Sequence, residues 1–309
     1  MHPHPTQNKL LGFAACGAAG ALWGTGFFFG KIALREMSVG HMVFYRFFFA
    51  IIALLPLLAT QRIHLNRREW IILLSASFLG VPIQFLLQFQ GLAMTTVAHA
   101  ALMVGMMPVI LAVGAAIFAH ERMNLTGWLA LVASTCGAAL IALGGHRSTV
   151  HTGDPSLAGD LLVVLSLVIA LFWILGNKRL MQRHSSLGIT AYGLFSGFLM
   201  LAIWVPLRSG MPPVHGISLR AWGALAASGV LCTAATTLLW NWGLTQVPAS
   251  QAGVFLNLEP MMGSVLGITL LGEHLGISAW IGGALILAAA ITLTTRSQVH
   301  ERSSIKVVA

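Results

Sequence analysis

The sequence of 309 residues has little charge: only 8% of its residues are Asp, Glu, Lys or Arg, against roughly a quarter in an ordinary soluble domain. Hydrophobic residues make up 57% of the chain, and 33 residues are glycine, which is more frequent in membrane-spanning helices than in soluble ones. The shortage of charge excludes a water-soluble globule, because so much apolar surface needs a solvent other than water. We therefore expect an all-α polytopic membrane protein.

Cysteine is also scarce, and the common catalytic motifs are missing. Cys16, Cys136 and Cys232 lie in apolar runs without paired spacing, which argues against a disulfide framework or a cysteine metal site. The string His120-Glu121 begins like a zinc-protease HExxH motif, but position 124 is Asn, so the second metal ligand is absent. Neither a Walker loop nor a nucleophilic-serine motif is present. The sequence therefore predicts no enzyme, no metal and no cofactor.

Ten apolar runs are long enough to cross a bilayer as helices, which takes about 20 residues each. The connections between them are too short for a soluble domain. The runs cover residues 10–34, 38–60, 69–91, 95–118, 124–145, 157–178, 187–208, 219–245, 249–272 and 277–296.

The placement of the basic residues predicts the orientation. An even number of spans puts both termini on one side, and most of the 17 Lys and Arg residues fall in loops and tails on that side. Because basic residues are retained on the cytoplasmic side, we expect both termini to be cytoplasmic and the chain to lie in the cell inner membrane. The net charge of +9 is thus a topology signal, and the expected partner is the lipid bilayer rather than nucleic acid.

An internal repeat appears when the sequence is shifted against itself by 152 positions. Pro108 then falls on Pro260, and Glu121 falls on Glu273. An anion at a helix C-terminus is unfavourable without a local partner, so we expect the two Glu residues to stabilise helix ends. Coincident Pro and Glu residues are hard to obtain from apolar bias alone, so the repeat is a real signal.

Each half of the repeat holds five spans, and an odd number reverses the second half relative to the first. The sequence predicts ten transmembrane helices as two inverted five-helix repeats, at 1–147 and 157–298, followed by a cytoplasmic tail at 299–309. Inverted repeats are typical of secondary transporters, although duplication for structural reasons alone is an alternative.

Two segments carry a family resemblance. GMMPVILAVGAAIFAHERMNLTGW and LNLEPMMGSVLGITLLGEHLGISAW resemble the paired EamA-type repeats of the drug/metabolite transporter superfamily, with a Pro, a later Glu and a Gly/Ala-rich final span. The resemblance extends to ALWGTGFFFGKIAL and RFFFAIIALLPLL, and so covers nearly the whole chain. It implies a ten-helix inner-membrane transporter, often an exporter of amino acids or other small metabolites. Met107 stands where the second repeat has Glu259, so the two halves differ chemically near the membrane centre.

Three of the charged residues in the expected spans are candidate functional groups, because an ionisable side chain within the membrane costs several kcal/mol unless it is partnered or protonated. Glu259 is a candidate for proton coupling or for binding a substrate amine; alternatively it seals a helix break. Lys31 shares a helix face with Trp23 and either binds a substrate carboxylate or extends to the interface. Arg46 either pairs with Glu36 or backbone carbonyls, or contributes to a cavity.

Prolines mark two expected helix breaks. Pro260 removes a backbone donor and frees carbonyls near Asn257 for a substrate. Pro108 is its counterpart in the first half, where a simple kink is the alternative.

Polar side chains recur one helical turn apart on single faces, and such amides and indoles suit a small amphipathic solute. Hydrogen bonding between helices is the alternative for each of them. These candidates are Gln84 with Gln88, Trp173 with Asn177, and Asn241.

The favoured function is therefore a secondary transporter, such as an exporter of amino acids, that alternates access around a midplane cavity with proton or exchange coupling. The alternative is an uncoupled facilitator or channel for small solutes, in which Glu259 would be dispensable.

Overall fold

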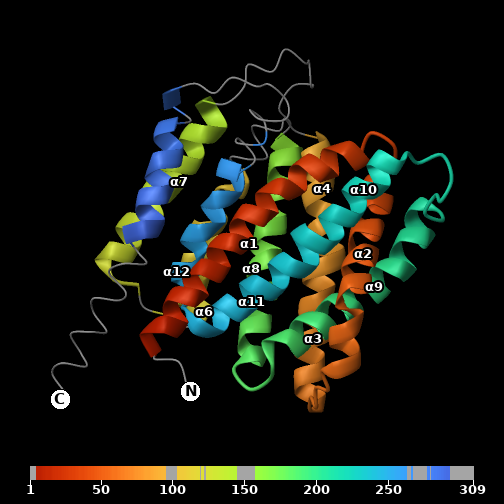
Figure 1. The fold of residues 1–309 in the computed structure, drawn as a ribbon, viewed down its shortest axis with the longest axis horizontal. Helices are drawn as coiled ribbons and strands as arrows, with labels where there is room; N and C mark the ends of the chain where they lie inside the picture. The colour runs from red at the N-terminus through yellow and green to blue at the C-terminus, as the bar shows by residue number, and fades with distance from the viewer. Residues whose placement is uncertain are drawn as a thin grey trace.

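The computed structural model consists of helices, turns and loops, without a strand in the residues that it describes (Figure 1). The all-α prediction is therefore confirmed for this part of the chain. The described residues are 5–94, 103–118, 120–121, 123–144, 157–262, 266, 277–278 and 280–292.

The first half contributes long helices and one π turn. These elements are α1 (Pro5–Ala33), α2 (Val39–Thr60), α3 (Arg67–Phe78), η1 (Leu79–Ile83), α4 (Gln84–Met94), α6 (Met107–Phe118) and α7 (Leu125–Gly144).

The second half repeats this pattern with a second π turn. It consists of α8 (Leu157–Met181), α9 (Ser186–Ser209), α10 (Leu219–Gly229), η2 (Val230–Ala235), α11 (Thr236–Gln246), α12 (Ala249–Ala252), η3 (Gly253–Asn257) and a final helix, Trp280–Thr292.

Six helices among the described residues are long and apolar enough to cross a membrane: Asn8–Gly30, Val39–Thr60, Arg67–Gly91, Leu157–Met181, Ser186–Ser209 and Leu219–Gln246. They match the first, second, third, sixth, seventh and eighth of the runs expected from the sequence. The other four runs correspond to shorter helices or extend into residues outside the described ranges. The multi-pass character follows, and the count of ten spans stays a prediction.

Polar side chains fix where several helices begin. Asn66 accepts a hydrogen bond from the Glu69 backbone at 2.9 Å, and the Glu69 carboxylate accepts one from the Asn66 backbone at 3.0 Å. This reciprocal capping box satisfies two backbone donors that the helix start would leave unpaired. Ser38, Ser185 and Ser218 cap α2, α9 and α10 in the simpler one-bond manner.

The two π turns interrupt the helices that run over residues 67–94 and 219–246, and they lie at matching positions in the two halves. Pro82 accounts for η1, because it cannot donate the regular helical hydrogen bond. Gly80 of η1 also has a packing role: the Trp173 ring lies where a Cβ atom would be. These wide turns are frequent at functional sites and draw attention to the space beside them.

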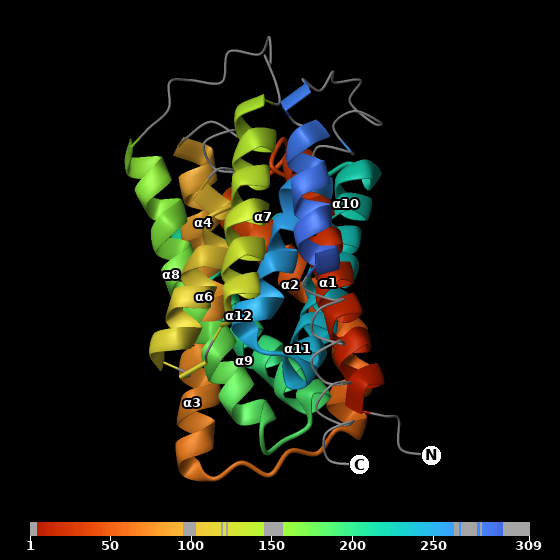
Figure 2. The same cartoon turned by 90° about the vertical axis from the view of Figure 1, so that its left-hand side faces the viewer.

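The two halves pack into one another. Helix α1 packs along α11 and α4 packs along α8, while α2 packs against both α9 and α10. In Figure 2, α7 lies beside the blue final helix. Gly137 allows this approach, since a Cβ atom there would lie 2.6 Å from the Gly282 carbonyl oxygen. The interior between the halves is where the candidate site lies.

Candidate functional site

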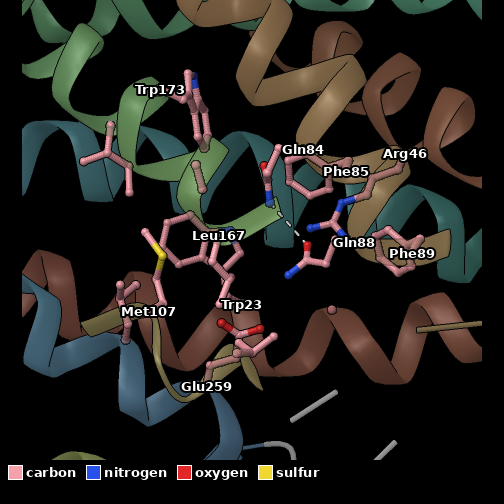
Figure 3. Close-up of a pocket in the computed structure, with 15 residues that line it drawn as sticks. Trp23, Arg46, Gln84, Phe85, Gln88, Phe89, Met107, Leu167, Trp173 and Glu259 are labelled. Carbon is pink, nitrogen blue, oxygen red and sulfur yellow. Dashed lines mark hydrogen bonds between the residues drawn. The ribbon is translucent and has the colours of Figure 1, made fainter. Parts of the chain in front are cut away.

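A cavity of about 90 Å³ lies between α1, α2, α4, α6, α8 and the segment that follows η3 (Figure 3). It is smaller than the roughly 300–1,000 Å³ of a typical ligand pocket, so a metabolite fits only when the surrounding helices part. Its lining residues are Trp23, Gly26, Arg46, Gln84, Phe85, Gln88, Phe89, Val104, Met107, Leu167, Ala170, Trp173, Ile174, Leu256 and Glu259.

Arg46 brings a fixed positive charge from α2 to this cavity. Its Nε donates to Thr233 Oγ1 at 2.7 Å, and its Nη2 donates to the Cys232 carbonyl oxygen at 2.9 Å. Both acceptors belong to η2, where the wide turn departs from the regular helical pattern. The guanidinium carbon also lies 5.1 Å from the centre of the Phe85 ring, within the range of a cation–π interaction. Arg46 is only 4% exposed, and these contacts hold it in place.

Glu36 is not the partner of Arg46, which was one of the pairings expected from the sequence. Its two carboxylate oxygens accept from the backbone N and the hydroxyl of Ser218, both at 2.7 Å. These two hydrogen bonds lower the pKa of the Glu36 carboxyl. Of the options expected for Arg46, the structure shows two: a hydrogen bond to a backbone carbonyl and a position in the cavity lining.

Two glutamines on α4 supply hydrogen-bonding groups. Gln84 Nε2 donates to Gln88 Oε1 at 3.3 Å, so the expected pairing on one helix face is present. Gln84 Oε1 is buried and has no partner among the described residues. In Figure 3 the Gln88 amide lies between Arg46 and the side of the cavity with Trp23 and Glu259. One acceptor and one amide nitrogen are thus available for a bound solute.

Glu259 lines the cavity from the turn of helix after η3, next to Trp23 of α1 (Figure 3). No hydrogen bond reaches its carboxylate within the described part of the chain. The positive charge of Arg46 acts on it electrostatically. Gly24 lets α1 approach this segment, because a Cβ atom there would overlap the Glu259 carbonyl oxygen. Glu259 is thus an ionisable group held in an apolar interior and open to a ligand or a proton.

Aromatic and aliphatic side chains form the remaining walls. The Trp23 and Trp240 rings lie 5.5 Å apart in a tilted arrangement, and Trp173 packs over Gly80. Sequence reasoning missed most of the apolar lining. Phe85 and Phe89 carried a readable signal, because they adjoin Gln84 and Gln88 with the same spacing of four residues.

Three asparagines that the sequence suggested for substrate binding lie outside the cavity lining. Asn241 Nδ2 donates to Thr190 Oγ1 at 2.8 Å, and Asn257 Nδ2 donates to Ser134 Oγ at 2.9 Å. These hydrogen bonds join α11 to α9 and η3 to α7. Both asparagines therefore connect helices, which was the alternative to substrate binding stated for Asn241. Asn177 is buried on α8, and its Oδ1 has no partner among the described residues.

The prolines differ in their local role from the expected mid-helix breaks. Pro108 is the second residue of α6, preceded by a turn at 105–106, so it starts a helix where a missing N–H costs little. Pro260 lies just after the 3-10 segment η3. A Cβ atom on Gly253 would lie 3.4 Å from the Pro108 carbonyl oxygen, so the two irregular segments are neighbours.

Two residues named in the sequence analysis lie wholly or in part outside the part of the chain that the structure describes. The side chain of Lys31 and the whole of Glu273 lie outside the described residues. Within the described ranges, no three His, Cys, Asp or Glu side chains gather closely enough to hold a metal ion.

Comparison with known proteins matches both halves of the chain. The model of the EamA-like transporter family matches residues 10–143 and again 157–295. An uncharacterized transporter of Archaeoglobus fulgidus is 26% identical over 90% of this chain and 94% of its own length. The biotin transporter of Escherichia coli is 26% identical over 92% of each chain. A probable terminal-alkyne amino-acid exporter of Streptantibioticus cattleyicolor is 26% identical over 66% of each.

The fold itself has a solved counterpart. A protein crystal structure superimposes with a TM-score of 0.77 over 96% of this chain and 99% of the other, at 16% identity. At that identity the likeness concerns the fold alone.

Proposed function

Because this chain belongs to the EamA-like transporter family, we propose that it is a secondary transporter that moves a small metabolite through the cavity between its two halves. The proposed solute is a small amphipathic metabolite such as an amino acid, and the proposed direction is export. The proposed energy source is a proton gradient or exchange against a second solute. The observation that carries this proposal is the Glu259 carboxylate, which faces an aromatic cavity without a hydrogen bond in the described residues.

Three observations support two inverted five-helix repeats, at 1–147 and 157–298, as the architecture of this transporter. The family model matches once in each half. The π turns η1 and η2 occupy matching places. Helix α1 packs on α11, and α8 packs on α4. Because α8 corresponds to α1 in the repeat and α11 corresponds to α4, exchanging the two halves converts one of these contacts into the other. Two oppositely facing copies of one unit make the inward- and outward-open states interconvertible.

The cavity suits a solute with one charged or polar end and an apolar body. Glu259 attracts an ammonium group or takes up a proton, because an ionised carboxylate in an apolar interior is stabilised by either. Gln84 Oε1 and the Gln88 amide accept and donate to the polar part of the solute. Trp23 and Trp173 provide faces for stacking an apolar or aromatic part.

The names of the relatives set the range of solutes to test. One relative is a biotin transporter and another a probable amino-acid exporter. Both kinds of solute carry a carboxylate and a body of moderate polarity. We propose that this chain acts on the same broad class, in a cell inner membrane with both termini cytoplasmic.

The test uses purified protein in proteoliposomes with a panel of labelled amino acids and biotin, each with and without a pH gradient. We expect uptake of at least one solute to depend on the gradient, and Glu259→Gln to abolish that dependence. Glu36→Gln is the matched control, because Glu36 is a carboxylate outside the cavity that is bonded to Ser218.

Two results would contradict the proposal. Solute flux that ignores the pH gradient, the Glu259→Gln change and solute preloaded on the opposite side of the membrane would show an uncoupled facilitator. Absence of flux for every solute with the wild-type protein would overturn small-metabolite transport of this class.

A further inference from the structure

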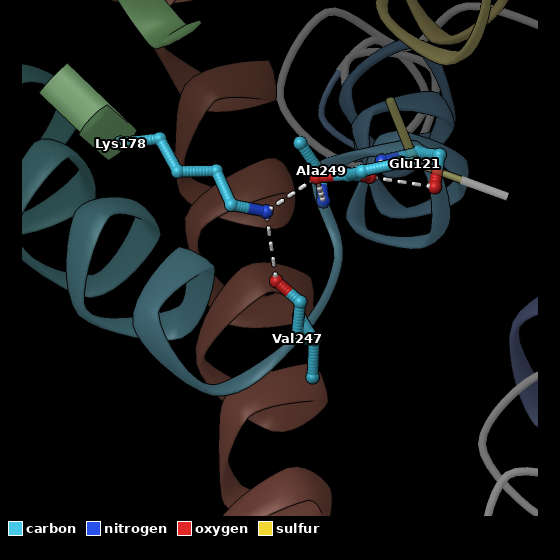
Figure 4. A network of polar contacts seen from close by, with 5 residues as sticks. Glu121, Lys178, Val247 and Ala249 are labelled. Atoms are coloured by element: carbon cyan, nitrogen blue, oxygen red, sulfur yellow. Dashed lines mark hydrogen bonds and ion pairs between the residues drawn. The ribbon is translucent and has the colours of Figure 1, made fainter. Parts of the chain in front are cut away.

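A second polar network lies away from the central cavity, on the side of the bundle where α1 begins and α8 ends (Figures 1 and 4). Lys178 in the last turn of α8 donates from Nζ to Glu121 Oε1 at 2.7 Å. The same Nζ lies 3.4 Å from the Val247 carbonyl oxygen, which also accepts from it. Glu121 stands shortly after the end of α6, so the ion pair joins the two halves of the sequence.

The Glu121 carboxylate is fully used. Besides Lys178, it accepts from the backbone N of Ala249 at 3.2 Å, and from the backbone N and hydroxyl of Ser250, each at 2.9 Å. Partial burial opposes ionisation of this carboxyl, but the hydrogen bonds from Lys178 and Ser250 outweigh it and lower the pKa of Glu121. The sequence predicted a local partner for the Glu121 anion at this helix end. The structure provides three partners: Lys178, Ala249 and Ser250.

The ion pair borders a second cavity, of about 450 Å³, on this side of the bundle. Glu121 and Lys178 line it together with Gln182 and Thr245, whose side chains are exposed. Leu244 contributes to the same lining. This second cavity is thus a vestibule next to the ion pair and continuous with the exposed surface.

Only about one helical turn separates the vestibule from the central cavity. On α8, Ile174 lines the central cavity and Lys178 lines the vestibule. On α11, Trp240 contacts Trp23 of the central cavity, and Leu244 lines the vestibule. The two cavities are therefore aligned along the same pair of helices, with a thin wall between them.

That wall contains polar atoms that it does not satisfy. Asn177 Oδ1 and Trp240 Nε1 are buried and lack a hydrogen-bond partner among the described residues. A buried polar atom without a partner is unfavourable, and native structures contain few of them. Both atoms would gain partners if the wall parted and water or solute entered. Such atoms are expected on a surface that becomes wet in another conformation.

We propose that the Glu121–Lys178 pair is the gate on the α1-start side of the transport pathway, holding the wall between cavity and vestibule closed in this conformation. This inference rests on the proposed function, because a gate is meaningful only in a chain that conducts a solute. Opening requires the end of α8 to separate from α12 and the segment after α6, which breaks the bonds from Lys178. The Ala249 and Ser250 bonds to Glu121 then stay intact, because they lie on the other side of the break.

The test measures access to the wall and needs no substrate. A reporter cysteine replaces Asn177 in a Cys136→Ser background, since Cys16 and Cys232 are both fully buried. Oriented membrane vesicles of both polarities are treated with a charged, membrane-impermeant thiol reagent. We expect Lys178→Gln to speed labelling of the reporter by about tenfold or more, only from the side that carries Lys178, because the closed state loses a charge-assisted hydrogen bond.

Arg179→Gln is the matched control, because it removes the same charge from the next, exposed position on α8. Its reporter should be labelled at the same rate as in the parent protein. Lys178→Arg keeps the ion pair, so its labelling rate should be close to that of the parent. Equal rates for Lys178→Gln and Arg179→Gln would overturn the gate. Where Lys178→Gln does not accumulate in membranes, Glu121→Gln takes its place with the same expectation.

The labelling result is independent of the proposed function. A wild-type protein that transports no solute defeats that function without changing the access measurement. Conversely, a transporter whose reporter stays protected in both gate variants keeps its function and loses this gate.

Discussion

The contact of Gly24 with the segment that carries Glu259 gives a quantitative prediction for Gly24→Ala. Glycine in a helix interior is less stable than alanine by about 0.5–1 kcal/mol, so an uncrowded Gly→Ala change should stabilise the protein by that amount. Gly223 on α10 provides this reference, because nothing lies within 4 Å of a Cβ atom placed there. Gly24→Ala gains the same stability from helix propensity, but its new Cβ atom collides with the segment that carries Glu259.

The size of the clash follows from the geometry. The new Cβ would overlap the Glu259 carbonyl oxygen and lie 2.8 Å from Met262 Cβ. Carbon atoms pack best at about 3.5–4.0 Å, so α1 must move by roughly 1 Å. Overpacking of this kind costs about 1–3 kcal/mol. Relative to Gly223→Ala, we expect Gly24→Ala to be about 1–3 kcal/mol less stable, because the gain in helix propensity is common to both variants and cancels.

Thermal unfolding of the two purified variants in the same detergent measures this difference. At about 2–4 °C per kcal/mol for a chain of more than 150 residues, the midpoints should differ by about 2 °C or more. Transport by Gly24→Ala should also fall, because the shift moves Trp23 relative to Glu259. Equal midpoints for the two variants would refute the close approach of α1 to this segment.

Two further predictions concern the polar contacts. Because the pKa of Glu121 lies below its ordinary value of 4.5, its stabilising contribution is complete above pH 4.5 and is lost as the pH falls through the lowered pKa. The difference in thermal midpoint between wild type and Glu121→Gln should therefore be constant from pH 7 to about pH 5 and shrink below pH 4.5; a difference that grows on acidification would contradict the ion pair. Asn241→Leu should cost only about 0.6 kcal/mol, the average for a hydrogen bond between membrane helices, because the Thr190 hydroxyl keeps its own acceptor, the Ser186 carbonyl. A loss above about 3 kcal/mol in reversible unfolding would show that Asn241 does more than join α11 to α9.

The sequence carried enough information for the helical membrane class and for much of the cavity. Long apolar runs have one stable form in lipid, because backbone groups must be satisfied within the segment. Arg46, Gln84 and Glu259 were candidates for a cavity because polar groups are costly in such runs, and all three lie in the cavity lining. Trp23 and Trp173 were also candidates for the cavity, because each lies on one helix face with a polar residue.

Other features depend on contacts between distant segments and were not predictable. Asn241 and Asn257 look like cavity residues in sequence, yet each has a hydroxyl partner on a helix far along the chain. The partner of Arg46 was equally hidden, because the Cys232 carbonyl becomes an acceptor through the π turn and not through residue type. Spacing within one helix shows which face a side chain occupies, and packing decides what it meets.

The Glu36–Ser218 contact has a consequence for the order of events during synthesis. The two residues are separated by 182 positions, so at about 5–20 residues per second Ser218 emerges roughly 10–40 s after Glu36. Throughout that interval the Glu36 carboxylate depends on interfacial water. The first helices can insert early, but the loop between α1 and α2 acquires its final partner only when α10 arrives. Completion of the first half is therefore timed by the ribosome's progress through the second.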